Sequence, residues 1–255
     1  MKDKLLKVFR FILVIIIIVC VFILGKRGLD YYKNYKNNKH ISSIVDEVEK
    51  DYEKDDKKDE DPFKAKEEKN LKILRKLQEE NSDVKGFFEI PGTYIAYPVM
   101  KADDNEFYLR KGIDKEYDIA GSLFMDYQND PKFNDDNTVI YGHYLEDIPS
   151  MFTALKDFRD QEYAQNNRTM YLTTNEGLRE YEIFSVYGTP ADYDYRTLSF
   201  YNPQDKVNYF QKLKDNSEVS LETRDFNEDD TIISLSTCQY DYEDQRLAVH
   251  GLRIK

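Results

Sequence analysis

The segment TIISLSTC at residues 231–238 and the segment RLAVHGLRI at residues 246–254 together indicate the fold class. Both are rich in β-branched and apolar residues, which favour strands, and a short connection separates them. Cys238 closes the first strand, and side-chain alternation places Arg246 and His250 on one face of the second. The two segments therefore predict a strand–loop–strand unit that presents a thiol at the end of a buried strand.

Further segments of the chain have the same strand-like character, and most are bounded by Gly, Pro, Asn or Asp. They are VKGFFEI (84–90), TYIAYPVM (93–100), GSLFMD (121–126), NTVIYGH (137–143), TMYLTT (169–174) and REYEIFSVYGT (179–189). Many short strands and few long helices predict a mainly β fold, a closed or half-closed and mainly antiparallel barrel of about eight strands. Helical insertions are expected at residues 149–158, 161–166 and 203–214.

The N-terminal segment contains an uninterrupted apolar run from Phe11 to Leu24, long enough for a thin membrane span if flanking residues extend it. More basic residues precede the run than follow it closely, so the N-terminus is expected in the cytoplasm and the rest of the chain outside. A cleaved signal peptide is the alternative. The exit VFILGKRG has no small-x-small cleavage site, which favours an uncleaved anchor.

The composition divides the chain into three parts. Residues 1–27 form the predicted cytoplasmic tail and transmembrane anchor, and residues 28–70 form a charged, partly helical stalk. The pattern LKILRKL at residues 71–77 predicts a helix that begins a globular domain of residues 71–255.

The charge and cysteine content exclude some functions. A net charge of −12 and a pI near 4.9 argue against a nucleic-acid partner. The chain has no Gly-rich phosphate loop either. Since Cys20 lies in the apolar run, Cys238 is the only exported cysteine, which indicates either a reactive thiol or a free cysteine that merely packs.

Acyl transfer by a cysteine needs a base and a donor for the developing oxyanion. His143, at the mouth of a strand, and His250, on the face of Arg246, are both candidates for the base. The guanidinium of Arg246 is a candidate oxyanion donor. A metal site built from Cys238, His143 and His250 is a weaker alternative, because their spacing matches no compact zinc motif.

These residues resemble the sortase family. SLSTC at 234–238 with Arg246 resembles the segment in which a strand ends in the nucleophile, and NTVIYGHYLEDIPSMFTAL at 137–155 resembles the histidine segment. FFEIPGTYIAYPVMKADDNEFYL at 87–109 resembles the entry strands of class B members. The resemblance covers residues 84–255 and implies a sortase β-barrel with N-terminal helices and a long helix, at residues 203–214, between two late strands.

The resemblance also implies roles. Cys238 corresponds to the nucleophile, His143 rather than His250 to the general acid/base, and Arg246 to the stabiliser of the substrate carbonyl. Substrate-binding positions carried over in the same way are Asn105, Leu109 and Ser236. The chain departs from the pattern at Ser234, where Thr is commoner, and at Tyr144, where Asn is frequent.

The expected reaction is transpeptidation through a thioacyl-enzyme. The partners implied are exported proteins with a C-terminal sorting motif and an amine acceptor, such as a peptidoglycan precursor or, in a pilin-polymerising sortase, a pilin lysine. No metal or cofactor is required. Alternatives are a membrane-tethered cysteine peptidase that uses water and a non-catalytic surface-binding barrel.

Overall fold

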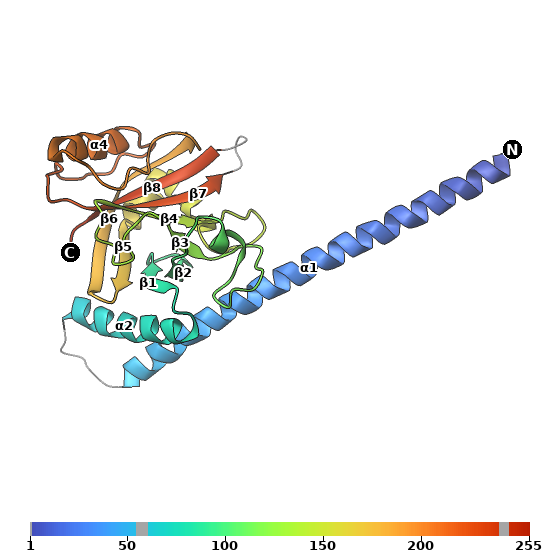
Figure 1. Cartoon of the computed structure of the whole chain (residues 1–255), viewed down its shortest axis with the longest axis horizontal. Coiled ribbons are helices and arrows are strands. Elements are labelled where there is room, and N and C mark those ends of the chain that lie inside the picture. The colour runs from blue at the N-terminus through green and yellow to red at the C-terminus, as the bar shows by residue number, and fades with distance from the viewer. Residues whose placement is uncertain (1, 55–60, 240–244) are drawn as a thin grey trace.

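The computed structural model describes residues 2–54, 61–239 and 245–255, with side chains for residues 4–52, 61–237 and 245–255. Within these residues, eight strands close into a barrel in the order β1-β2-β3-β4-β7-β8-β6-β5 (Figure 1). The strands are β1 Val84–Glu89, β2 Ala96–Met100, β3 Leu123–Met125, β4 Asn137–Gly142, β5 Thr169–Thr174, β6 Gly177–Pro190, β7 Ile232–Gln239 and β8 Gln245–Arg253. The predicted mainly β barrel is confirmed.

Most neighbouring strands pair antiparallel, but β2 with β3 and β4 with β7 pair in parallel. A parallel pair cannot be joined by a tight hairpin, so a long connection must separate its two strands in the chain. Between β4 and β7 that connection contains β5, β6 and three helical segments. This crossover places the ends of β4 and β7 side by side.

The helical segments lie around the barrel. They are α1 Lys2–Lys54, α2 Pro62–Glu80, η1 Phe107–Arg110, η2 Thr153–Arg159, α3 Gln161–Asn166 and α4 Pro203–Asp215, where η denotes a 3₁₀ helix. Helices were expected at residues 161–166 and 203–214, and both are confirmed as α3 and α4. In α4, the Asn202 side chain accepts a hydrogen bond from the Gln204 N–H and Pro203 occupies the first turn, two features that start a helix.

The helix expected at residues 149–158 is wrong in its first part. Residues 149–152 are irregular, and a 3₁₀ helix begins only at Thr153. Met151 has a φ of 49°, in the left-handed region, and an α-helix cannot continue through such a residue.

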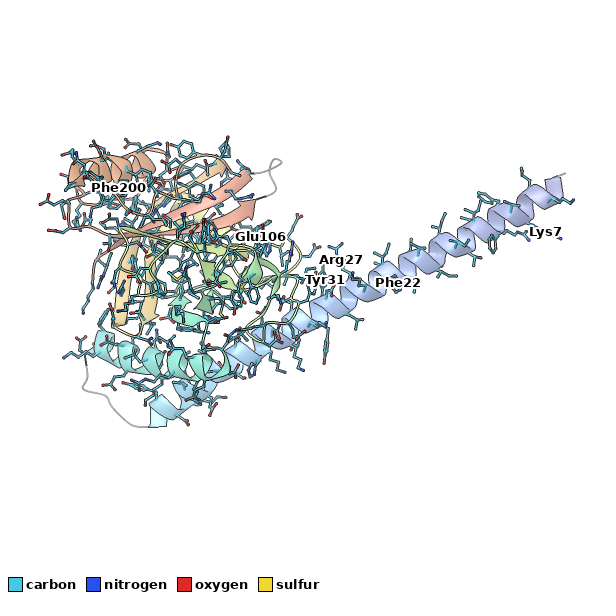
Figure 2. The ribbon with its side chains drawn as sticks, in the orientation of Figure 1. Lys7, Phe22, Arg27, Tyr31, Glu106 and Phe200 are labelled. Atoms are coloured by element: carbon cyan, nitrogen blue, oxygen red, sulfur yellow. The ribbon has the colours of Figure 1, made fainter. Side chains whose placement is uncertain are left out.

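The N-terminal part of α1 projects away from the domain. Figure 2 shows Lys7 and Phe22 on this projecting part and Arg27 and Tyr31 where α1 reaches the domain. The apolar run is exposed along its length, with Phe22 at 72% of its maximal exposure. By length and composition α1 can cross a membrane. An exposed apolar surface of this size is typical of a membrane or protein interaction site.

The C-terminal part of α1 packs against the domain. Ile41 joins the barrel core, whereas Ile44 and Val48 join a second cluster with Ile73 and Leu77 of α2. The spacing of the three α1 residues places them on one helix face. Of the predicted stalk, residues 28–54 and 62–70 are helical, and residues 55–60 lie outside the described part of the chain. The predicted domain boundary at 70/71 falls inside α2.

Candidate active site

The ends of three neighbouring strands meet at one end of the barrel. In the parallel pair β4–β7, Gly142 lies opposite Thr237, so His143 and Cys238 each follow directly after paired residues. In the antiparallel pair β7–β8, Cys238 lies opposite Arg246. The strand register therefore brings together the backbones of the three residues predicted for catalysis. The Cys238 side chain lies outside the described side chains.

A cleft with a cavity volume of about 170 Å³ opens at this end of the barrel. It is lined by Asn105, Leu109, Phe124, Tyr141, Gly142, His143, Tyr195, Arg196, Ser236, Thr237 and Arg246. The predicted acid/base, the predicted carbonyl stabiliser and all three predicted substrate-binding residues are among them.

The imidazole of His143 is buried and held by one backbone hydrogen bond. Its exposed fraction is 6%, and its Nε2 lies 2.8 Å from the main-chain oxygen of Leu109. Because a carbonyl oxygen only accepts hydrogen bonds, Nε2 must carry a proton. In the neutral imidazole, Nδ1 is then the nitrogen with a free lone pair.

The surroundings of His143 disfavour its charged form. Burial, together with the positive charges of Arg110 and Arg246, lowers its pKa to about 4, against the opposing effect of the hydrogen bond to Leu109. At neutral pH the resting imidazole is therefore uncharged and able to accept a proton at Nδ1.

The Leu109 carbonyl belongs to the short helix η1. The side chain of Asp104, just before this helix, satisfies N–H groups at its start. The Oδ1 atom of Asp104 accepts hydrogen bonds from the Glu106 N–H at 2.9 Å and from the Phe107 N–H at 2.7 Å. Such turns are typical of Asp before a helical segment, because its carboxylate satisfies the first N–H groups. This local structure places Leu109 over the end of β4.

A hydrogen-bonded network fixes Asn105 at the cleft. Its Nδ2 donates to Asp126 Oδ2 at 3.0 Å, and its Oδ1 accepts from the Tyr127 N–H at 2.9 Å. The Tyr141 hydroxyl donates to the same Asp126 oxygen at 2.8 Å. Burial and the Asp126 charge raise the pKa of Tyr141 far above its usual range, so this hydroxyl stays protonated.

The strand that leads to Cys238 carries Ser236 into the cleft wall. Its hydroxyl lies 2.7 Å from the Tyr195 hydroxyl, and Ser236 is only 2% exposed. Tyr195 comes from the connection between β6 and α4. The contact therefore holds the connection between β6 and α4 against the cleft wall.

The competing candidate His250 lies elsewhere. It is fully buried, its Nδ1 lies 2.7 Å from the Ser234 hydroxyl, and its Nε2 lies 3.1 Å from the Tyr187 hydroxyl. Because Ser234 donates its only proton to Asn137 Oδ1 at 2.8 Å, the Nδ1 of His250 must be the donor to Ser234. Burial lowers the pKa of His250 to about 3. It is not among the residues that line the cleft, and its partners identify it as a neutral core histidine.

Sequence reasoning missed several residues of the cleft. Tyr141 had a usable signal, since alternation along the strand NTVIYGH places it on the same face as His143. Tyr195 and Arg196 had none, because they come from an irregular connection whose path depends on the tertiary fold. Arg196 adds a second guanidinium to the cleft beside Arg246.

The alternative metal site predicted from the sequence includes Cys238, whose side chain lies outside the described side chains. Among the residues that the structure describes, no group of three or more His, Cys, Asp or Glu side chains lies close enough to hold a metal ion.

Comparison with known proteins identifies the family. The family model for the sortase domain matches residues 88–254. Sortase B of Listeria monocytogenes is 34% identical over 240 residues, which cover 92% of this chain and 93% of the relative. The chain therefore belongs to the sortase family, whose members are cysteine transpeptidases.

Solved structures similar to this chain are of sortase B proteins. Sortase B from B. anthracis aligns with a TM-score of 0.73 and 32% identity, covering 89% of this chain and 99% of that chain. The Staphylococcus aureus sortase B–substrate complex aligns with a TM-score of 0.67 and 29% identity, covering 72% and 85%. A sortase B complexed with triglycine aligns with a TM-score of 0.67 and 30% identity, covering 72% and 86%. The chain is most similar to class B sortases.

Proposed function

We propose that this chain is a membrane-anchored sortase that cleaves a sorting motif on exported proteins and transfers the acyl group to an amine of the cell wall. The observation that carries the proposal is the strand register at the cleft. This register sets Cys238 opposite Arg246, and it pairs Gly142 with Thr237, so that His143 and Cys238 each follow a member of that pair. A nucleophile, a base and a cation for an oxyanion are the groups that acyl transfer by cysteine requires.

In the first half-reaction, the Cys238 thiolate attacks the carbonyl carbon of a threonine in the sorting motif. The C–N bond of the scissile peptide breaks, and His143 gives a proton to the leaving amine. The product is a thioester between Cys238 and the threonine acyl group. In the second half-reaction the amine of the acceptor attacks this thioester, the C–S bond breaks, and the thiol is regenerated.

The tautomer of His143 supports its proposed role. Because Nε2 donates to Leu109, the proton that moves during the reaction must be carried by Nδ1. A thiol has an ordinary pKa of about 8.5, and the pKa of His143 is lowered to about 4. At neutral pH the thiolate–imidazolium pair is therefore a minor species, and we expect slow turnover.

Arg246 supplies a fixed positive charge to the cleft wall. Its Nη1 donates to the Gln245 main-chain oxygen at 3.2 Å, which orients the guanidinium locally. The remaining N–H groups are suited to the oxygen that gains negative charge in the tetrahedral intermediate.

The substrates are proposed from the relatives. The S. aureus enzyme was solved with a substrate, and another sortase B was solved with triglycine, a short peptide. For this chain we propose a peptide sorting motif that contacts Asn105, Leu109 and Ser236 at the cleft, and the amine of a peptidoglycan precursor as the acceptor.

The proposed location is the outer face of the cell membrane. The exposed apolar run Phe11–Leu24 is suited to a single membrane span, and the basic residues before it favour a cytoplasmic N-terminus. Residues 1–27 would then form the cytoplasmic tail and the transmembrane anchor. The α1 helix continues without a break from this run to Lys54, and the catalytic domain follows it outside the cell.

Product analysis tests the proposed reaction. The full chain in detergent micelles is incubated with sorting-motif peptides, with and without a glycine-based amine, and the products are identified by mass. Ligated product that requires both Cys238 and the amine supports transpeptidation. Hydrolysed product alone, at every amine concentration, contradicts it and supports the peptidase alternative.

A further inference from the structure

A buried carboxylate outside the cleft connects α1 to the catalytic domain. Asp118 lies in the connection between η1 and β3 and is 1% exposed. Its Oδ1 accepts from Asn34 Nδ2 and its Oδ2 from Asn37 Nδ2, each at 2.8 Å, and both asparagines belong to α1. The Ala120 N–H donates to Oδ1 at 2.9 Å. Side chains of α1 thus hold both oxygens of Asp118.

The docking of α1 decides whether these hydrogen bonds form. A buried carboxylate is costly unless N–H groups satisfy its oxygens, and α1 supplies two of the three that hold Asp118. If α1 left the domain, Asp118 would lose these two donors and the connection around it would rearrange.

The connection around Asp118 in turn holds the end of η1. The Asp118 N–H donates to the Arg110 main-chain oxygen at 3.0 Å, and the Ser122 N–H donates to the Tyr108 main-chain oxygen at 3.1 Å. The Gly121 N–H donates to the Asp118 main-chain oxygen at 3.1 Å, which closes the turn between them. The carbonyls on both sides of Leu109 are therefore fixed by this one turn.

The same turn touches the carbonyl that His143 uses. Gly121 has a φ of +61°, and a Cβ placed on it would overlap the Leu109 oxygen. The backbone of Gly121 thus presses against the Leu109 peptide, and only glycine permits that approach. The position of the Leu109 oxygen, which holds Nε2 of His143, depends on where this turn lies.

We propose that Asp118, held by Asn34 and Asn37 of α1, is a positioning residue for His143. Docking of α1 fixes the turn at residues 118–122, the turn fixes the Leu109 carbonyl, and that carbonyl selects the imidazole tautomer that leaves Nδ1 free. The anchor helix is then part of the support of the active site, besides attaching the enzyme to the membrane. The inference rests on the proposed acid/base role of His143.

Two substitutions at one position test the proposal in the full chain. Asp118→Ala removes all three acceptor contacts. Asp118→Asn keeps an oxygen for Asn34 and for the Ala120 N–H, and its amide can donate to Asn37 once the Asn37 side chain rotates. We expect Asp118→Ala to lower kcat by about 10- to 100-fold with a smaller change in KM. Asp118→Asn should stay within about threefold of the wild type, the cost of one altered hydrogen bond.

The helix side of the contact gives an independent variant. The double substitution Asn34→Leu with Asn37→Leu removes both α1 donors and leaves the domain sequence unchanged. It should lower kcat in the same direction as Asp118→Ala, and it replaces that variant if Asp118→Ala does not fold. Lys36→Leu, an exposed position on the same helix, is the matched control and should leave kcat unchanged.

The tautomer of His143 separates positioning from general stability. In ¹⁵N NMR spectra of the full chain in micelles, His143 should show protonated Nε2 in the wild type and in Asp118→Asn. In Asp118→Ala and in the double variant, a substantial share of the Nδ1-protonated tautomer should appear. Variants that only melt at lower temperature, with kcat and the His143 signals of the wild type, overturn the proposal.

The same data distinguish this inference from the proposed function. If the His143→Ala variant is fully active, His143 is not the general acid/base, whatever the NMR spectra show. If His143→Ala is inactive but the His143 signals are unchanged in Asp118→Ala, the acid/base role of His143 stands. In that case Asp118 does not position His143.

Discussion

The Nε2 atom of His143 lies 2.8 Å from the main-chain oxygen of Leu109, and this contact determines which nitrogen can take part in proton transfer. Leu109 was predicted from the sequence as a substrate-binding position. Leu109 lines the cleft, and its carbonyl oxygen holds the imidazole of His143. One residue thus links the substrate groove to the proposed acid/base.

The protonation state of resting His143 is the first prediction. Since burial and two guanidinium charges disfavour its charged form, we expect the imidazole to stay neutral and Nε2-protonated from pH 8 down to about pH 5, and to titrate near pH 4. A ¹⁵N NMR titration of the Cys238→Ala variant, which removes the thiol, measures this directly. A midpoint above pH 6 would contradict the environment described for His143.

The second prediction concerns Arg246. Replacing it by Ala removes the guanidinium from the cleft wall and should lower kcat by about 10²- to 10³-fold, the usual effect of losing an oxyanion donor. Arg246→Lys keeps the charge but not the planar arrangement of donors, so it should recover only part of the rate. The exposed Arg253 on the same strand offers a matched control. If Arg246→Ala and Arg253→Ala reduce kcat equally, Arg246 has no special role.

The third prediction is a pH dependence of stability that arises from His250. Above the unfolded-state pKa of about 6.5, the residue is neutral in both states and has no linkage effect. Below that pH the unfolded chain binds a proton that the folded chain excludes until about pH 3, so the free energy of unfolding decreases as the pH falls.

The expected slope is about 1.4 kcal/mol per pH unit from this residue. Urea unfolding at several pH values between 6 and 4 should therefore show a shallower dependence for His250→Gln than for the wild type. Parallel dependences for the two proteins would show that His250 is not held neutral by the fold.

Ser234, where the chain departs from the commoner Thr of its family, is the subject of the fourth prediction. Its hydroxyl donates to Asn137 and accepts from His250, and all three residues are buried. Ser234→Ala leaves both partners unsatisfied and should destabilise the protein by about 1–3 kcal/mol. Ser199→Ala, at an exposed position, should change stability by less than about 0.5 kcal/mol. Equal chemical-denaturation midpoints for the two variants would show that the buried hydroxyl contributes nothing.

Most of the barrel strands were predictable because they are runs of β-branched or aromatic residues with a turn residue at their ends. The pairing of strands was less accessible, since β4 and β7 are neighbours in the barrel but far apart in the chain. The residues Cys238, His143 and Arg246 were selected by family resemblance, and the strand register places their backbones close together at one end of the barrel. Local sequence says little about such long-range pairing.

Two features escaped sequence reasoning for different reasons. The docking face of α1 has an apolar stripe at Ile41, Ile44 and Val48, which the surrounding charged residues obscured. Its contacts through Asn34 and Asn37 have no periodic signal, because amides are equally suited to a solvent-exposed helix. Only the buried partner Asp118 reveals their role.

The central claim is that Cys238 carries the acyl group of a sorting motif, and intact-mass spectrometry of the full chain tests it most directly. The protein is incubated with a library of sorting-motif peptides, and the wild type is compared with Cys238→Ala. We predict a mass gain equal to the acyl part of one peptide, absent in Cys238→Ala and removed on addition of an amine. An adduct that persists in Cys238→Ala, or no adduct with any peptide, would contradict the account.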